Sequence, residues 1–333
     1  MDMWTVFTAA EHDSWRRQLD RLPRYDVYHE AGYHQAYETD GLTRAHAYVA
    51  EIGGEILFHP IMIRPIETVG GKAAPPGLCD AETVYGYSGP LATSHDPAFL
   101  TEAWQGYEDW CRDQHLVCEF QRFNPLLGNH VLAAPGSTVW HDRSTVAIDL
   151  SLGEDQLWSR YAGPQRNRVR KAQKSGLQCA ERALRDDLPG FLLLYKLTME
   201  KLSADEFYKF PQSYYERLLE ALGPNLKLFV VTLGDKDIAA ALFMVHGDRM
   251  HYHLGCSSPA HRDFAPNNLL FHEVARWAIA CGLKTFHLGG GRTLAPDDTL
   301  LRFKTRLSPK RLDQFFGKHI HDCHAYEDLC AMW

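Results

Sequence analysis

The chain has 333 residues, of which 45% are hydrophobic and 23% charged, a composition that fits two globular domains and excludes disordered, collagen-like and coiled-coil proteins. No apolar run approaches the ~18 residues of a membrane span, and the acidic N-terminus is not a signal peptide, so we expect a cytoplasmic protein. The net charge of −7 argues against a general nucleic-acid binder, and the eight cysteines, without a C-x-x-C pair, indicate reduced thiols.

The charge is divided unevenly along the chain. Residues 1–150 carry 10 basic and 21 acidic side chains, a balance of −11, whereas residues 151–333 carry 25 and 21, a balance of +4. We therefore expect any polyanionic partner to bind the second half.

The first half has the pattern of an α/β module. Residues 47–63 predict two strands around the Gly53-Gly54 turn, and 83–92 predict a third strand. An amphipathic helix is expected over 97–115, followed by a closing strand over 116–125.

The segment between the halves predicts helices. Ser151 can cap a short helix, Gly163-Pro164 breaks it, and Gln165 to Lys174 form a second, strongly basic helix. Two further helices are expected over 186–202 and 211–222.

The second half repeats the order of the first. Strands are expected over 228–245 and 247–258, a helix over 266–282 that Asn267 or Asn268 can cap, and a buried strand over 284–291. One offset of 167 residues relates Tyr85 to Tyr252 and Trp110 to Trp277. Although this order of elements is common enough to recur by chance, we interpret it as two copies of one α/β (α+β) module, 1–150 and 151–333.

Several residues could carry chemistry, but no nucleotide-binding, serine-hydrolase or zinc-protease motif is present. Gly289-Gly290-Gly291 fits a tight turn better than a phosphate loop. His251 and His253 alternate on one strand face, where they line a cleft or belong to the core. Asp297 and Asp298 are either an acid/base pair or a solvated or helix-capping pair.

A histidine-rich tract near the C-terminus resembles a metal-binding sequence. His319 and His321 could ligate from one strand face, with Cys323 and His324 nearby. Because no second ligand group has motif spacing, we predict no metal.

Two basic stretches suggest contacts with anions. On the basic helix, Arg166, Arg170 and Lys174 form one row with Lys171 beside it, which is either a phosphate-binding face or a solvated one. If the stretch from 300 to 311 begins as a strand, Arg302, Lys304 and Arg306 share one face and require an anion.

At this point the sequence resembles a known family. RNRVRKAQKSGLQ (166–178), YHLGCSSPAHRDFAPNNLLFHEVARWAIACGLKTFHLGGG (252–291) and LLRFKTRLSP (300–309) are similar to the Fem-type (FemX-, FemA- and FemB-like) aminoacyl-tRNA-dependent peptidyltransferases. The resemblance implies two tandem GNAT-like modules, each a twisted mixed sheet flanked by helices, in the compact form that lacks the coiled-coil insertion.

The resemblance also implies an activity. Such enzymes transfer an amino acid from aminoacyl-tRNA to an amine of a peptidoglycan precursor, a peptide or a nucleoside-peptide antibiotic precursor. We expect direct aminolysis of the ester, with aminoacyl-tRNA as co-substrate and no other cofactor. A classical acyl-CoA site is disfavoured, because the segment 261–270 has no glycine and Pro266 removes a backbone donor.

Roles follow for individual residues. Lys304 matches the family's F-K lysine and is the expected catalytic group, and Tyr252 could donate to the substrate carbonyl. The expected substrate-binding residues are Tyr208, Lys209, Tyr87, Ser88 and Arg302, the first four of them on the acceptor side. Those expected for tRNA are Arg166, Arg170, Lys171, Lys174 and Arg306.

The sequence departs from the family in two respects. The family's F-K-x-x-F-G element is imperfect here, because Lys304 is followed by TRLSP. The region 28–41 contains Glu38 but no lysine, whereas the family uses an early lysine to bind precursor phosphates. A smaller or cationic acceptor is therefore easier to accommodate. The alternatives are an acyl-CoA-dependent N-acyltransferase and a non-catalytic tRNA- or precursor-binding protein. The transferred amino acid, the acceptor, the general base and the oligomeric state stay open.

Overall fold

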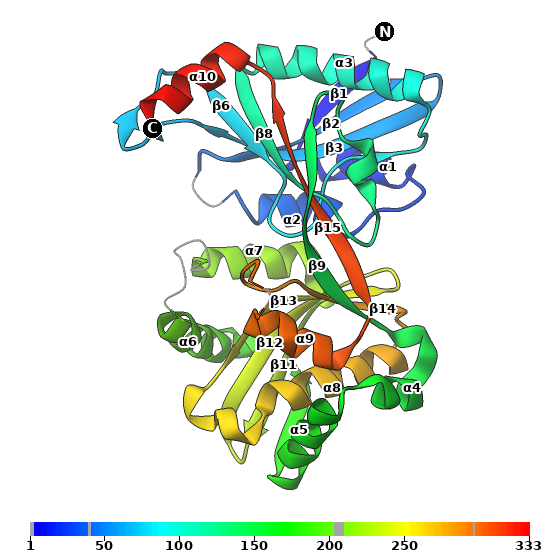
Figure 1. Ribbon diagram of the computed structural model, residues 1–333, viewed down its shortest axis with the longest axis vertical. Coiled ribbons are helices and arrows are strands. Elements are labelled where there is room, and N and C mark those ends of the chain that lie inside the picture. The colour runs from blue at the N-terminus through cyan, green and yellow to red at the C-terminus, as the bar shows by residue number, and fades with distance from the viewer. Residues whose placement is uncertain (1–2, 39–40, 203–209, 296) are drawn as a thin grey trace. The chain divides into compact units, whose positions relative to one another are not determined.

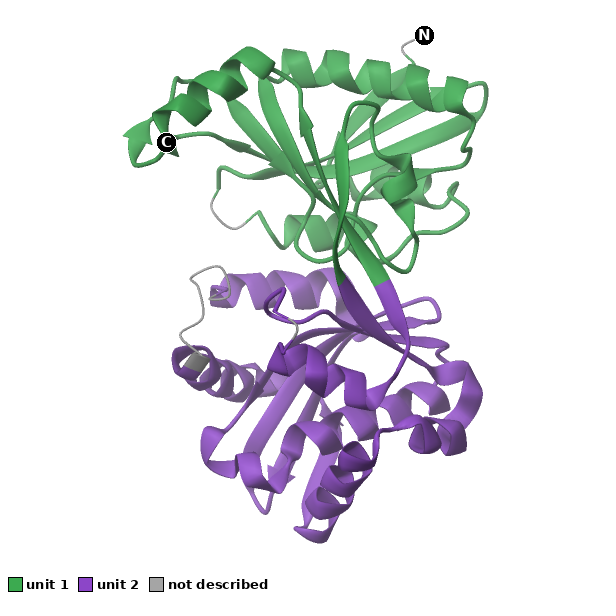
Figure 2. Ribbon diagram, in the orientation of Figure 1, with its two compact units in different colours: residues 1–143, 313–333 green, residues 144–312 purple. Residues whose placement is uncertain are grey.

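The computed structural model describes residues 3–38, 41–202, 210–295 and 297–333. The chain forms two compact units, unit 1 with residues 1–143 and 313–333 and unit 2 with residues 144–312 (Figure 2). This division lies close to the predicted boundary at residue 150, but the C-terminal segment differs from the prediction. It belongs to unit 1, because its strand pairs with a strand of that unit.

Unit 1 is built around a mixed sheet whose strands follow the order β1-β2-β3-β6-β8-β15 (Figure 1). β6 and β8 are parallel and α3 joins them, while the other neighbouring pairs printed for this path are antiparallel. Asp96 starts α3 by accepting a hydrogen bond from Phe99 N at 3.0 Å. The elements are β1 (Trp4–Thr8), α1 (His12–Leu19), η1 (Val27–His29), α2 (Ala31–Gln35), β2 (Arg44–Ile52), β3 (Glu55–Pro65), β4 (Thr68–Val69), β5 (Lys72–Ala73), β6 (Cys79–Glu82), β7 (Leu91–Ala92), α3 (Pro97–Asp113), β8 (Leu116–Arg122), η2 (Asn129–Leu132), most of β15 (Arg311–Ile320) and α10 (Cys323–Met332).

Unit 2 has a sheet of the same design, in the order β9-β14-β13-β12-β11-β10. Here β13 and β14 are parallel and are joined by α8. The elements are β9 (Thr138–Asp149, which begins in unit 1), η3 (Leu150–Leu152), α4 (Gly153–Arg160), α5 (Gly163–Lys174), β10 (Leu177–Arg182), α6 (Leu184–Leu202), α7 (Gln212–Leu222), η5 (Gly223–Asn225), β11 (Leu226–Leu233), β12 (Lys236–His246), β13 (Arg249–Ser257), η6 (Pro259–Phe264), α8 (Pro266–Ala280), β14 (Thr285–Gly289) and α9 (Thr299–Leu307).

The predicted duplication is confirmed by the order of elements. In each unit, three antiparallel strands precede a fourth strand. A helix then leads from the fourth strand to a fifth, which is parallel to the fourth. Trp110 and Trp277 lie on the two equivalent helices, α3 and α8. The sixth strand of each sheet is supplied by a segment that starts in the other unit, β15 for unit 1 and β9 for unit 2.

Helices cover both faces of each sheet. In unit 2, α4, α5, α8 and α9 contribute to one apolar core, and α6 packs with α7 and the opposite face (Figure 1). Phe243 and Phe286 are fully buried in this core, and each such side chain contributes roughly 1.5–3 kcal/mol. None of the described helices combines the length and apolar character needed to cross a membrane.

Four local predictions were wrong. Ser151 does not cap α4, whose preceding residue is Leu152. The strand expected over 83–92 lies earlier, as β6, because residues 83–90 turn to bring Ser88 beside Phe123. The stretch after residue 299 is a helix, α9. Neither Asn267 nor Asn268 caps α8, whose preceding residue is Ala265 in the left-handed region at φ 59°.

Candidate active site

Lys304 lies on the buried side of α9. The sequence places Asp298 three residues before Leu301, and the Asp298 carboxylate accepts a hydrogen bond from Leu301 N at 2.7 Å, which starts the helix. Helical spacing then buries Lys304 and Leu307 together. The Lys304 side chain is only 4% exposed.

Two neighbours hold the Lys304 ammonium group. Nζ donates a hydrogen bond to the Gly290 carbonyl oxygen at 2.6 Å and lies 5.4 Å from the centroid of the Tyr252 ring. Among the residues that the structure describes, no carboxylate lies within ion-pair distance of Nζ. Burial lowers the pKa of Lys304 to about 7, and the more distant Asp298 charge opposes this shift.

Tyr252 is set against Lys304 by an irregularity of β13. The pairing with β12 shifts between Leu242 and Phe243, so His253 is an extra residue in the strand. The Tyr252 ring then packs on Phe271, at 5.0 Å between centroids, and over Gly255, where any side chain would collide with it. Burial raises the pKa of Tyr252, so its hydroxyl stays a hydrogen-bond donor at neutral pH.

Asp298 caps a helix, which was one of the alternatives considered for it. Besides Leu301 N, its carboxylate accepts from Arg292 N at 3.1 Å and from Thr293 N at 3.0 Å. Burial raises its pKa, but these hydrogen bonds outweigh that effect and the net pKa is lowered. A side chain at Gly291 would clash with this carboxylate, so only glycine at this position allows the turn to pack closely against Asp298. Asp298 therefore holds the Gly290 loop against α9.

Arg302 and Arg306 do not share a face with Lys304. The prediction of an alternating strand was wrong, because on a helix residues two apart point in different directions. Both arginine side chains are exposed, whereas Lys304 is buried. Any anion that the two arginines bind would lie on the surface of α9. The helical spacing of Leu301, Lys304 and Leu307 in the sequence could have predicted a helix with Lys304 on its buried side.

The basic helix forms as predicted, as α5. The side chains of Arg170, Lys171 and Lys174 are exposed, and Arg170 lies 5.2 Å from the Trp158 ring centroid. α5 contacts α9, and Ala162 N just before it donates to Arg306 O at 2.9 Å. The exposed cations of the two helices therefore belong to adjoining elements.

Arg166 differs from the other cations of α5. Its guanidinium donates to the carbonyl of Ser159 at 3.2 Å and to the carbonyl of Tyr161. Its Nη1 group thus fastens α5 to the end of α4.

The residues expected to bind the acceptor lie apart in the chain. Ser88 is fully buried in unit 1, where its hydroxyl donates to the Tyr28 carbonyl at 3.0 Å, so it packs in the core and does not line an open pocket. Tyr87 is partly buried against the Tyr28 ring, at 5.5 Å between centroids. Tyr208 and Lys209 lie outside the described residues.

The start of α8 offers little to a pyrophosphate. Pro266 occupies the first helical position, and Asn268 N bonds to the Ala265 carbonyl at 3.1 Å. The Asn268 side chain reaches Gln165 of α5, with Nδ2 donating to Oε1 at 2.5 Å. This helix terminus has no glycine and is tied to α5.

The histidines of β13 are core residues. Both His251 and His253 are buried, and His253 Nε2 lies 2.6 Å from the Tyr214 hydroxyl. Burial lowers the pKa of His253 to about 3, so it is neutral. His251 packs on His287, with 5.6 Å between ring centroids. In unit 1, His319 and His321 meet Glu108, a residue that the sequence did not single out.

A protein-family model matches part of the chain. Residues 164–305 match the model of an acetyltransferase (GNAT) domain, and all of them lie in unit 2. The matched stretch contains α5 except its first residue, together with Tyr252 and Lys304.

Curated relatives are distant. The chain is 24% identical to a lipid II:glycine glycyltransferase of Staphylococcus epidermidis, over 44% of this chain and 50% of that protein. The chain therefore spans about half the length of the curated relatives it matches.

Solved structures match over nearly the whole chain. FemX has a TM-score of 0.71 at 16% identity, with 97% of this chain and 98% of that chain covered. A tandem GNAT protein from the clavulanic acid biosynthesis pathway has a TM-score of 0.57 at 11% identity, with 96% and 98% covered. At these identities the likeness is one of fold.

Proposed function

We propose that this chain, which has a Fem-like tandem GNAT fold, is an aminoacyltransferase that forms an amide bond between an amino acid and an acceptor amine. The observation that carries the proposal is Lys304, a buried lysine with a lowered pKa, held on a carbonyl and an aromatic face in the unit that matches the GNAT domain. Groups with such shifted pKa values are concentrated at catalytic sites.

The proposed reaction is aminolysis of an aminoacyl ester. The acceptor nitrogen attacks the ester carbonyl carbon, the C–N bond forms, and the bond to the ribose oxygen breaks. The amine loses one proton and the ribose oxygen gains one. With a pKa of about 7, Lys304 Nζ can give a proton to the leaving oxygen and accept one from the amine at neutral pH.

Tyr252 and the Gly290 loop complete the proposed site. The protonated Tyr252 hydroxyl can donate to the substrate carbonyl oxygen as negative charge develops there. The Gly290 carbonyl orients Nζ, and Asp298 fixes the loop that carries this carbonyl. Positioned donors of this kind are typically worth about 10²–10³ in kcat.

The proposed donor is aminoacyl-tRNA, with Arg170, Lys171, Lys174, Arg302 and Arg306 as the phosphate-binding surface. Their exposure and the contact between α5 and α9 support this role. The proposed acceptor is a peptide amine, for which the relatives suggest a peptidoglycan precursor, and the acidic first half of the chain favours one with cationic groups.

An acyl-CoA-dependent acyltransferase is the second candidate, because the family model that matches is an acetyltransferase domain. The glycine-free start of α8, with Pro266 at its first position, argues against a CoA pyrophosphate there.

Donor binding is the first experiment. The protein is titrated with mixed aminoacyl-tRNA and, separately, with acetyl-CoA, at low and moderate salt. Salt-sensitive binding of tRNA without binding of CoA supports the proposal. Tight binding of CoA with no affinity for tRNA contradicts it.

Turnover tests the role of Lys304. We expect Lys304→Met to lower kcat by about 10²–10³ while tRNA affinity changes little, because Lys304 acts on the reacting atoms. The exposed Lys284→Met is the matched control and should keep full activity. Equal kcat in the two variants would remove Lys304 from the mechanism.

A further inference from the structure

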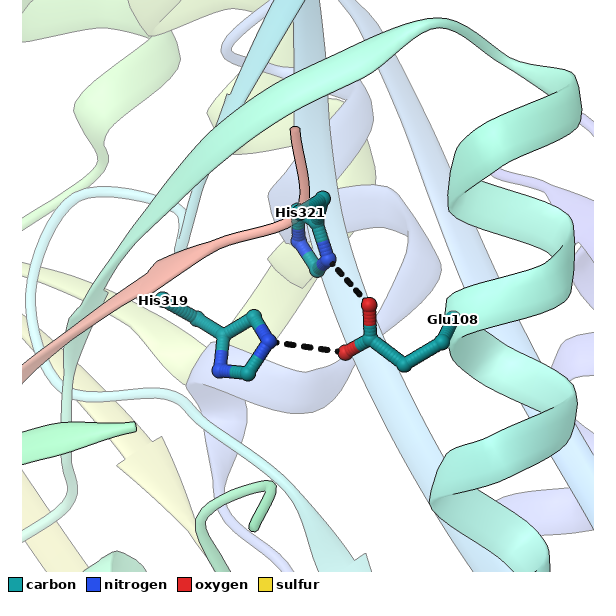
Figure 3. A group of neighbouring side chains, drawn as sticks. All are labelled: Glu108, His319 and His321. Carbon is teal, nitrogen blue, oxygen red and sulfur yellow. Dashed lines mark hydrogen bonds and ion pairs between the residues drawn. The ribbon is translucent and has the colours of Figure 1, made fainter. Parts of the chain in front are cut away.

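Three side chains of unit 1 converge on one point (Figure 3). Glu108 projects from α3, while His319 lies on β15 and His321 directly follows that strand. One oxygen and two ring nitrogens of these residues all lie within 4.8 Å of one another. His319 Nε2 is 2.8 Å from Glu108 Oε1, and His321 Nδ1 is 2.8 Å from Glu108 Oε2.

The backbone brings these groups together for a simple reason. Residues two apart along an extended strand point to the same face, so the two imidazoles lie side by side, with 4.7 Å between ring centroids. α3 supplies the carboxylate opposite them. Donors at 2.0–2.1 Å from a tetrahedral zinc ion are about 3.3 Å apart, a spacing that small side-chain rotations would produce here.

The outer nitrogen of each imidazole faces a second polar group. His319 Nδ1 lies 3.0 Å from the Ser137 hydroxyl, and His321 Nε2 lies 3.7 Å from Glu119 Oε2. Glu119 is in turn held by the Tyr107 hydroxyl at 2.8 Å. Metal-binding histidines commonly have one nitrogen on the metal and the other hydrogen-bonded to an outer partner. His319 has this outer hydrogen bond, whereas His321 Nε2 is only within ion-pair distance of Glu119.

One atom of this cluster has an ion-pair contact but lacks a directed hydrogen bond. Glu108 Oε1 is buried and accepts no hydrogen bond of good geometry, although His319 Nε2 approaches it to 2.8 Å. A nitrogen and an oxygen that approach closely without a directed hydrogen bond can instead both point at a third centre.

We propose that Glu108, His319 and His321 form a Zn²⁺ site, with water in the fourth position, that fastens the end of β15 to α3. Two imidazoles and one carboxylate suit zinc, whereas Mg²⁺ and Ca²⁺ prefer oxygen ligands throughout. The Glu108 side chain is 27% exposed and so gives an ion access from solvent, whereas His321 is 2% exposed. Cys323 and His324, also part of the histidine-rich tract, are exposed on α10 and are not ligands.

Metal titration of the full chain tests the proposal. The protein is stripped with a chelator, and Zn²⁺ or Mg²⁺ is added back while bound metal and the unfolding temperature are measured. We expect one Zn²⁺ per chain, an unfolding temperature that rises with the logarithm of zinc concentration, and no response to Mg²⁺. Co²⁺ should give the visible absorption of a four-coordinate site.

Variants assign the ligands. His319→Ala and Glu108→Gln should abolish stoichiometric binding, and Ser137→Ala should weaken it by about 10-fold through loss of the outer partner. His324→Ala and Cys323→Ser are matched controls that should bind as the unaltered chain does. Comparison in chelator, where every protein is metal-free, separates a folding defect from loss of the site. Absence of zinc from the unaltered chain, or equal binding by His319→Ala, would overturn the proposal.

Discussion

The two units have the same order of strands but bury charge in different ways. In unit 1, Glu119 is 2% exposed and is paired with His59 Nε2 at 2.7 Å and with the Tyr107 hydroxyl at 2.8 Å. Burial alone would raise the pKa of Glu119, but His59 and His321 hold it well below its usual range. In unit 2, Lys304 is equally buried but has a carbonyl and a ring as neighbours.

This difference separates a stabilising charge from a reactive one. A buried charge with its counterion and hydrogen bonds in place holds neighbouring elements together, and removing one partner is costly. A buried charge without a counterion retains a shifted pKa, which costs stability but makes proton transfer possible near neutral pH. Glu119 in unit 1 shows the first arrangement, and Lys304 shows the second among the residues that the structure describes.

The largest effect on stability is expected from breaking the pairing in unit 1. Glu119→Ala leaves His59 and His321 buried beside a cavity and should lower the free energy of unfolding by about 3–5 kcal/mol. Urea unfolding at pH 7 measures this change. The exposed Glu102→Ala on α3 is the control and should cost less than about 0.5 kcal/mol. If Glu119→Ala lowered the free energy of unfolding as little as the control does, the buried ion pairs of unit 1 would not be stabilising and the contrast with Lys304 would fail.

In unit 2, removing the buried charge of Lys304 should raise the free energy of unfolding instead of lowering it. The folded-state pKa of Lys304 is lowered to about 7, so between pH 7 and its unfolded value of 10.5 the unfolded chain binds more protons. Stability therefore rises with pH in that window, and the cost of burying the ammonium is greatest below it. Lys304→Met should raise the free energy of unfolding by about 4 kcal/mol at pH 7, and this gain should vanish near pH 10.5. Thermal unfolding across pH measures it, and a gain independent of pH would contradict the assignment.

Exposed charge gives the smallest of these effects. The triple variant Arg170→Glu, Lys171→Glu, Lys174→Glu should weaken tRNA binding by roughly 10–100-fold and reduce the slope of log affinity against log salt by about 2. A matched triple variant in unit 1, at the exposed Arg17, Arg24 and Arg112, should leave that slope unchanged.

Arg166 provides a further test on α5, because its Nη1 group already donates to two carbonyls at the end of α4. Arg166→Ala should cost about 1 kcal/mol of stability and leave the salt slope unaltered. Urea unfolding and salt titration distinguish the two outcomes. A slope that changes as much as in the triple variant would instead give Arg166 a direct contact with tRNA.

Local sequence patterns account for much of the fold. The apolar periodicity of α3 and α8, the turns between strands and the basic helix α5 were all predictable, because each depends on residues close together in the chain. The same reasoning failed for α9, where charges two apart suggested a strand and the cap at Asp298 was left as one of two alternatives.

Tertiary structure decided the rest. The sequence by itself determined the duplicated order of elements, the uneven charge and the family resemblance that singled out Lys304 and Tyr252. It could not show that residues 313–320 return to unit 1, that Arg166 and Ser88 are engaged inside the protein, or that Glu108 meets His319 and His321. These features depend on contacts between residues far apart in the chain, which no local sequence pattern records. Burial among such contacts also lowers the pKa of Lys304.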